Sequence, residues 1–235
     1  MPDSASPSLE AFDSRITEHR NPRSLSLDVL STRQILELIN DEDATVIPAV
    51  RREIPNIERA VDLIVAQLER GGRLFYVGAG TSGRLGMLDA AEIPPTYGAD
   101  PSLVQGIIAG GHAALVRSQE GAEDREDDGA AVVKAYRMTP DDAVFGIAAS
   151  GTTPFVRGAL HAACEAGLPT ILLSCTPPDE SLRRWATCCI TPITGPEVVT
   201  GSTRMKAGTA TKLVLNMVTT AAMVRVGKVY ENLMV

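Results

Sequence analysis

Five short apolar runs, separated by stretches with helical spacing, constrain the fold of this chain more than any other feature of its sequence. They occupy residues 74–77, 103–109, 143–148, 170–174 and 188–191, and each is typical of a buried strand. Alternation of strands and helices predicts a three-layer α/β sandwich, with a five-stranded parallel sheet covered by helices on both faces. Ligands of such sheets bind beyond the carboxyl ends of the strands.

The first seventy residues predict a helical arm that leads into this sandwich. Ser31 or Thr32 is expected to cap a helix that the polar run 40–43 interrupts. A second helix has apolar residues at positions 57, 60, 61, 64, 65 and 68 and ends at Gly71. We therefore divide the chain into a disordered lead-in (1–15), a helical arm (16–70) and a sandwich domain (71–235) with helices near 154–166 and 205–226. The apolar end at 232–235 suggests a truncated chain.

Composition narrows the classes of partner. A net charge of −7 disfavours a nucleic-acid surface but permits an anionic small ligand. We expect no membrane partner, because no apolar run reaches the ~18 residues of a spanning helix. The N-terminus also lacks the features of a signal peptide, so a cytoplasmic protein is expected.

The cysteines and histidines show no metal-binding pattern. The four cysteines (164, 175, 188 and 189) form no CxxC pair, and the three histidines (19, 112 and 161) lie far apart in sequence. We expect reduced structural thiols, no metal and no cofactor.

Three loops carry hydroxyl side chains at the expected start of a helix, where free backbone N–H groups bind anions. They contribute Gly80, Thr81 and Ser82 in the first loop, Ser150, Thr152 and Thr153 in the second, and Ser202 with Lys206 in the third. One such loop alone is explained equally well as a plain strand-to-helix turn. Three of them favour phosphate binding, with Lys206 or Arg204 offsetting the charge.

Five motifs in order resemble a known family. They are Ile-Asn-Asp-Glu-Asp at 39–43, Gly-Ala-Gly-Thr-Ser-Gly-Arg-Leu-Gly at 78–86, Ala-Glu-Ile-Pro-Pro-Thr at 91–96, Glu-Gly-Ala-Glu-Asp at 120–124 and Gly-Pro-Glu-Val-Val-Thr-Gly-Ser at 195–202. Together they resemble the sugar isomerase (SIS) domain family and, within it, the N-acetylmuramic acid 6-phosphate etherases, from about residue 16 to the end. The resemblance implies a flavodoxin-like sheet that binds phosphosugars through Ser/Thr loops. Two positions depart from the family: Ile93 replaces its usual cysteine, and Thr152 replaces its usual arginine. The family also continues past residue 235 with a small helical region.

The resemblance also implies a reaction. Etherases of this family cleave the D-lactyl ether of their sugar by elimination and hydration, without metal or redox cofactor, in cell-wall amino-sugar recycling. It places the general acid at Glu92 and the general base at Glu123. An acid that stays protonated near neutral pH needs a raised pKa, and the apolar neighbours of Glu92 suit this. By composition alone, the acidic stretch around Glu123 indicates a solvated helix face.

Other residues and functions stay open. Glu197 could open or orient the sugar ring, or cap a local turn; Asp89 and Tyr97 are expected to be structural. An aldose–ketose isomerase would remove the same C2 proton, and a regulatory SIS module would bind a phosphosugar without turnover. The paired carboxyl groups favour the etherase. A homodimer is expected, because SIS-domain sites commonly borrow residues from a neighbouring subunit.

Overall fold

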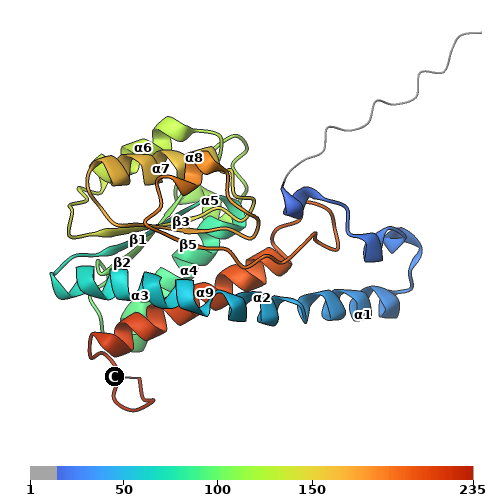
Figure 1. The fold of residues 1–235 in the computed structure, drawn as a ribbon, viewed down its shortest axis with the longest axis horizontal. Coiled ribbons are helices and arrows are strands. Elements are labelled where there is room, and N and C mark those ends of the chain that lie inside the picture. Colours follow the sequence, from blue (N-terminus) through green and yellow to red (C-terminus); the bar gives the residue numbers. More distant parts are fainter. Residues whose placement is uncertain (1–14, 235) are drawn as a thin grey trace, which may run out of the picture.

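The computed structural model describes residues 15–234, which form a three-layer α/β sandwich with a helical arm at its N-terminal end (Figure 1). The lead-in predicted for residues 1–15 lies almost entirely outside the described residues. The sheet has five parallel strands in the order β2-β1-β3-β4-β5. They are β1 (Leu74–Gly78), β2 (Val104–Ile108), β3 (Ala143–Ile147), β4 (Thr170–Leu173) and β5 (Cys188–Ile190). Each coincides with one of the five apolar runs, so the predicted sheet is confirmed.

The helices complete the alternation. Those of the arm are α1 (Thr32–Asp43) and α2 (Val46–Arg52), preceded by short 3-10 turns at Ile16–Glu18, Pro22–Ser24 and Leu27–Val29. Those around the sheet are α3 (Ile54–Glu69), α4 (Gly80–Tyr97), α5 (Ala113–Val116), α6 (Glu126–Ala135), α7 (Pro154–Glu165), α8 (Glu180–Arg183) and α9 (Lys206–Arg225). No helix in the described part of the chain is long and apolar enough to span a bilayer.

The sheet buries both of its faces, because successive side chains of a strand point to opposite sides. Leu74 and Tyr76 of β1 pack in one core cluster with residues of α3, α4 and α9. Phe75 and Val77 pack in the other cluster with residues of α6, α7 and α8. The two helical layers lie above and below the sheet in Figure 1. This arrangement explains why the strands read as continuous apolar runs.

The arm begins as its sequence predicts but does not break where expected. Ser31 accepts a hydrogen bond from the N–H of Gln34, and the Gln34 side chain bonds back to Ser31, so a capping box starts α1. The predicted interruption at 40–43 is wrong, since α1 runs through Asp43. A charged residue such as Glu42 is usually exposed to solvent. Here it is buried and accepts hydrogen bonds from Asn21 and Lys206. Those partners are distant in sequence, and they keep this polar turn helical.

The last helix of the predicted arm (16–70), α3, belongs to the core. Ile57, Ile64 and Val65 of α3 are buried in the same cluster as Val214 and Val218 of α9. The domain boundary at residue 70 stays a prediction. Structurally, α3 is part of the layer that covers the sheet.

Candidate active site

The strand order places two of the hydroxyl-bearing loops next to each other. β1 and β3 pair in the middle of the sheet, with Gly78 opposite Ile147, while the chain moves outward from them in opposite directions. A parallel sheet binds ligands at such a switch point. The loop with Thr81 and Ser82 and the loop with Ser150 therefore leave the sheet side by side at its carboxyl edge.

Both loops end in the first turn of a helix, as predicted. Thr81 and Ser82 lie in the first turn of α4, which begins at Gly80, and Thr153 directly precedes Pro154 at the start of α7. The hydroxyl oxygens of Ser150 and Thr152 are 3.4 Å apart. The loops thus present side-chain hydroxyls beside the free N–H groups of two helix N-termini, an arrangement that suits a phosphate.

The third loop reaches the first through α9. A Cβ added to Gly208 of α9 would lie 3.7 Å from the methyl carbon of Thr81. The loop 201–205 leads directly into this helix, with Ser202 and Thr203 half-buried. The three predicted loops therefore gather around the N-terminus of α4.

Glu123 lies at this edge of the sheet and shares a cavity with the first loop. The cavity has a volume of about 210 Å³, and its lining includes Gly80, Arg84, Ala109 and Glu123. The carbonyl of Glu123 accepts a hydrogen bond of 2.9 Å from the N–H of Phe155 in α7. The structure therefore brings the predicted base and the predicted phosphate loops together.

Two glycines fix how closely the segment with Glu123 approaches the second loop. Helix α6, which follows this segment, lies against α7. A Cβ on Gly129 would lie 1.9 Å from the carbonyl oxygen of Phe155, and one on Gly158 would lie 2.0 Å from that of Glu126. The two backbones are in contact, so a side chain at either position would force the helices apart.

Glu92 lies elsewhere in the described chain. It is twelve residues beyond Gly80 on α4, which corresponds to about 18 Å of helix. It lines a separate cavity of about 220 Å³ with Asp89, Lys212 and Asn216. Its side chain is exposed, so the burial expected for Glu92 is not present within a single described subunit. Of its apolar neighbours, Ala90 and Ile93 are buried in the core, whereas Ala91 is exposed like Glu92 itself.

Asp89 and Tyr97 have the structural surroundings that were expected. The Asp89 carboxylate is buried and accepts hydrogen bonds from Tyr76, Asn216 and Thr219. Burial raises the pKa of Asp89, and the hydrogen bonds from Asn216, Tyr76 and Thr219 oppose that rise. The Tyr97 hydroxyl lies 3.2 Å from that of Thr220. Both residues tie α9 to its neighbours.

Glu197 caps a helix. Its side chain is fully buried, and its two oxygens accept hydrogen bonds of 3.0 Å from the backbone N–H groups of Lys206 and Ala207 at the start of α9. Burial raises the pKa of Glu197, and the two N–H groups act against that rise. Of its possible roles, this geometry favours the capping one.

We expect Glu197→Gln to lower the free energy of unfolding by about 1–3 kcal/mol, because the amide group would face one of the two N–H donors. Thermal unfolding measures the loss. Glu37→Gln, on the exposed face of α1, is the control and should leave the melting temperature unchanged. Equal melting temperatures for Glu197→Gln and the wild type would contradict the assigned cap.

Lys206 points into the arm. Its ammonium lies 2.6 Å from Oε2 of Glu42, and both side chains are more than nine-tenths buried. Its predicted contact with phosphate stays a prediction, and the pair with Glu42 occupies its charge. Sequence inspection also missed Arg84 in the Glu123 cavity and Lys212 beside Glu92, since local patterns do not show which helix faces meet.

Comparisons with known proteins agree with this architecture. Residues 56–164 match the family described as glucokinase regulatory protein N-terminal SIS domain. A phosphoheptose isomerase from Neisseria gonorrhoeae has a similar fold, with a TM-score of 0.61 at 14% identity over 81% of this chain and 98% of that one. The N-acetylmuramic acid 6-phosphate etherase of Salinibacter ruber is 56% identical over all of this chain and 75% of its own length. That of Symbiobacterium thermophilum is 57% identical over 94% of this chain and 73% of its own. The sheet, the loops and this level of identity together show that the chain belongs to the N-acetylmuramic acid 6-phosphate etherase family.

Proposed function

We propose that this chain cleaves the D-lactyl ether of N-acetylmuramic acid 6-phosphate by elimination and hydration, giving N-acetylglucosamine 6-phosphate and D-lactate. Family membership supports the substrate and the reaction. The observation that carries the proposal is the cavity shared by Gly80 and Glu123, because it places Glu123 beside the first of the hydroxyl loops. The reaction belongs to cell-wall amino-sugar recycling.

The loops would hold the phosphate and fix the sugar. Thr81 and Ser82 at the start of α4, with Ser150, Thr152 and Thr153 before α7, supply hydroxyl and backbone donors. Anchoring the phosphate places the far end of an open-chain sugar toward Glu123.

Glu123 acts as the base in this proposal. It removes the proton from C2, which the neighbouring aldehyde acidifies, and the electrons of that bond form the C2–C3 double bond. The bond from C3 to the lactyl oxygen breaks, and this oxygen takes a proton from the neutral carboxyl group of Glu92. Water then adds to C3 with Glu92 as base, and Glu123 returns the proton to C2.

We propose that the two glutamates meet across a homodimer. They line different cavities within one described subunit, so a single chain does not bring them to one sugar. Glu92 is exposed, and the exposed apolar side chain of Leu88 lines the same cavity. A partner that covers this surface would bury Glu92, and burial would supply the raised pKa that an acid requires.

A D-lactate assay tests the proposed function. N-acetylmuramic acid 6-phosphate is incubated with the protein, and D-lactate is measured enzymatically, with the unphosphorylated sugar as the control. Release of lactate from the phosphorylated sugar alone is expected. Conversion between aldose and ketose without release of lactate would identify an isomerase. Binding without any turnover would identify a regulatory module. Either result would refute the proposal.

Restoring the family's arginine at position 152 should raise the affinity for the phosphate group of the substrate. We expect Thr152→Arg to lower KM for N-acetylmuramic acid 6-phosphate about tenfold, the effect of one added charge-assisted hydrogen bond. Initial rates at varied substrate concentration give KM. Thr152→Gln, which is long but uncharged, is the control and should change KM little. An unchanged KM in Thr152→Arg would show that residue 152 does not face the phosphate.

The proposed compartment is the cytoplasm. All four cysteines are free thiols in the structure, a state that reducing compartments maintain.

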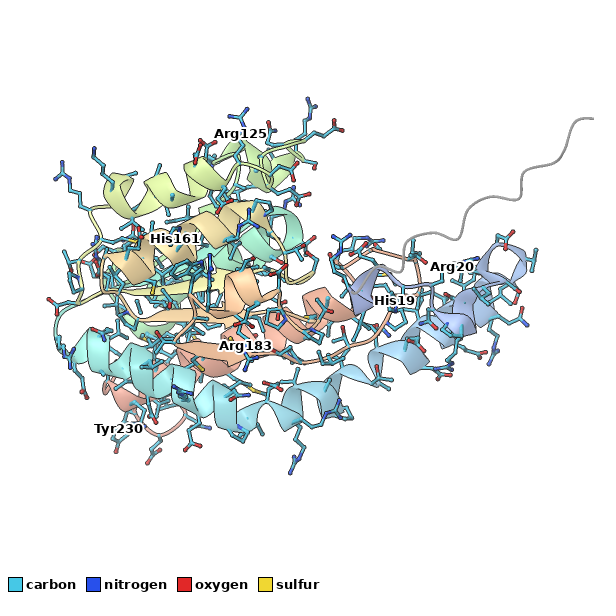
Figure 2. The ribbon with its side chains drawn as sticks, turned by 45° about the horizontal axis from the view of Figure 1, so that its top comes forward. His19, Arg20, Arg125, His161, Arg183 and Tyr230 are labelled. Atoms are coloured by element: carbon cyan, nitrogen blue, oxygen red, sulfur yellow. The ribbon has the colours of Figure 1, made fainter. Side chains whose placement is uncertain are left out.

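His161 of α7, labelled in Figure 2, stacks on the ring of Trp185, and the two ring centroids lie 4.2 Å apart. This contact supports a packing role for that histidine.

A further inference from the structure

A buried polar cluster joins the N-terminal segment to the start of α9. Glu42 accepts three hydrogen bonds: from Lys206 at 2.6 Å, from Asn21 at 2.8 Å and from Arg23 at 2.9 Å. Burial alone would raise the pKa of Glu42, but its hydrogen bonds with Lys206, Asn21 and Arg23 hold that pKa below its usual value. The cluster therefore contains a charged carboxylate whose partners come from segments far apart in the chain.

The segment 16–23 is attached to the loops at the carboxyl edge of the sheet. The N–H of Ile16 donates to the hydroxyl of Thr176, just beyond β4, at 3.1 Å. The amide of Asn21 also donates to the carbonyl of Pro196 at 3.2 Å. The carboxylate of Glu18 lies so close to Gly201 that a Cβ there would be 2.9 Å from its oxygen.

These contacts surround the third hydroxyl loop. Lys206 is the first residue of α9, directly after the loop 201–205, so its ammonium fixes where that loop ends. Gly201, at the other end of the loop, meets Glu18. Figures 1 and 2 show the N-terminal segment, with His19 and Arg20 labelled in Figure 2, beside the loop that leads into α9.

We propose that the segment 16–23 and the Glu42–Lys206 pair form a strap that positions the loop 201–205 for the phosphosugar, with Glu42, Lys206 and Asn21 as positioning residues. The inference rests on the proposed function for the identity of the sugar. Helix α9 contacts the first of the proposed phosphate loops directly, because Gly208 lies beside Thr81. A displaced strap would move Ser202 and Thr203 relative to Thr81 and weaken binding.

Stability alone does not account for such a cluster. Replacing a buried ion pair by apolar side chains of similar size is often neutral or stabilising, whereas removing one partner strands a buried charge. The double variant Glu42→Leu with Lys206→Met therefore separates positioning from folding. In this double variant, Arg23 retains its ion pair with Asp41 at 3.0 Å, and Asn21 retains its hydrogen bond to the carbonyl of Pro196.

The experiment compares KM, kcat and melting temperature for the wild type and this double variant in the D-lactate assay. Calorimetry with N-acetylglucosamine 6-phosphate gives affinity without turnover. We expect a melting temperature near that of the wild type, KM and the dissociation constant raised about tenfold, and kcat changed much less, the pattern of lost uniform binding. Arg73→Met is the matched control. It removes a partly buried ion pair at the opposite edge of the sheet, and Asp142 keeps backbone donors from Arg73 and Thr139.

A folded double variant with the KM and affinity of the wild type overturns the strap, and so does an equal loss of affinity in Arg73→Met. If the double variant fails to fold, Asn21→Ala decides, since it cuts the links to Glu42 and Pro196 but keeps the ion pair. A several-fold rise in its KM supports the strap, and an unchanged KM overturns it. A wild type that binds the sugar phosphate but releases no lactate refutes the proposed function alone, because the comparison of affinities still tests the strap.

Discussion

Replacing Glu123 with glutamine is expected to lower kcat for D-lactate release by roughly 10²–10⁴-fold, the usual contribution of a positioned general base. Glutamine has nearly the same shape but cannot accept the C2 proton. Binding of the phosphosugar should survive, because the hydroxyl loops that would hold the phosphate are untouched. The loss should therefore fall on kcat while KM and the calorimetric affinity for N-acetylglucosamine 6-phosphate stay close to those of the wild type.

The matched control for this variant is Asp127→Asn. It removes a negative charge from the same acidic stretch, on the exposed side of α6, and should keep wild-type rates. Near-wild-type lactate release by Glu123→Gln would show that another group is the base. A parallel loss in Asp127→Asn would instead assign the effect to the net charge of the stretch.

Mixing two inactive variants is expected to restore activity if the site forms between subunits. Subunits carrying Glu92→Gln and subunits carrying Glu123→Gln are each expected to be nearly inactive alone. In a heterodimer of the two, one site combines both substitutions, while the other receives an intact Glu92 and an intact Glu123. Random reassociation of an equal mixture should recover about a quarter of the wild-type activity, since half of the dimers are mixed and each has one intact site.

The complementation is measured as D-lactate release after the mixture is unfolded and refolded together, with each variant refolded alone as the control. Analytical ultracentrifugation of the wild type checks that the active species is a dimer. A mixture no more active than the separate variants would place both glutamates in one subunit. A fully active monomer would remove the need for a partner.

The sheet and its loops were predictable from the sequence because they depend on local patterns. Apolar runs mark strands buried on both faces, and glycine with hydroxyl residues marks the turns after them. The same locality explains the confirmed capping box at Ser31.

The rest depends on contacts between distant segments. The run 40–43 looks like a helix break in sequence. In the structure, however, Glu42 pairs with Lys206 across the fold, and α1 runs through Asp43. Lys206 looks like a free cation until that same pairing is known. The apolar neighbours of Glu92 suggested burial, but the rotation of α4 leaves Glu92 exposed in the single subunit. Which helix face meets which neighbour is decided by tertiary packing, and a local pattern does not contain it.

The contact between α6 and α7 has a consequence for changing the substrate range of this protein. Gly129 and Gly158 let the two backbones touch, and the carbonyl of Glu123 is bonded to the first turn of α7. The segment that carries the proposed base is therefore tied to the helix whose start is proposed to hold the phosphate. A longer or bulkier sugar would have to be accommodated on the side of α4 and, in the proposed dimer, of the partner subunit, since widening the gap on the α7 side would carry Glu123 along with it.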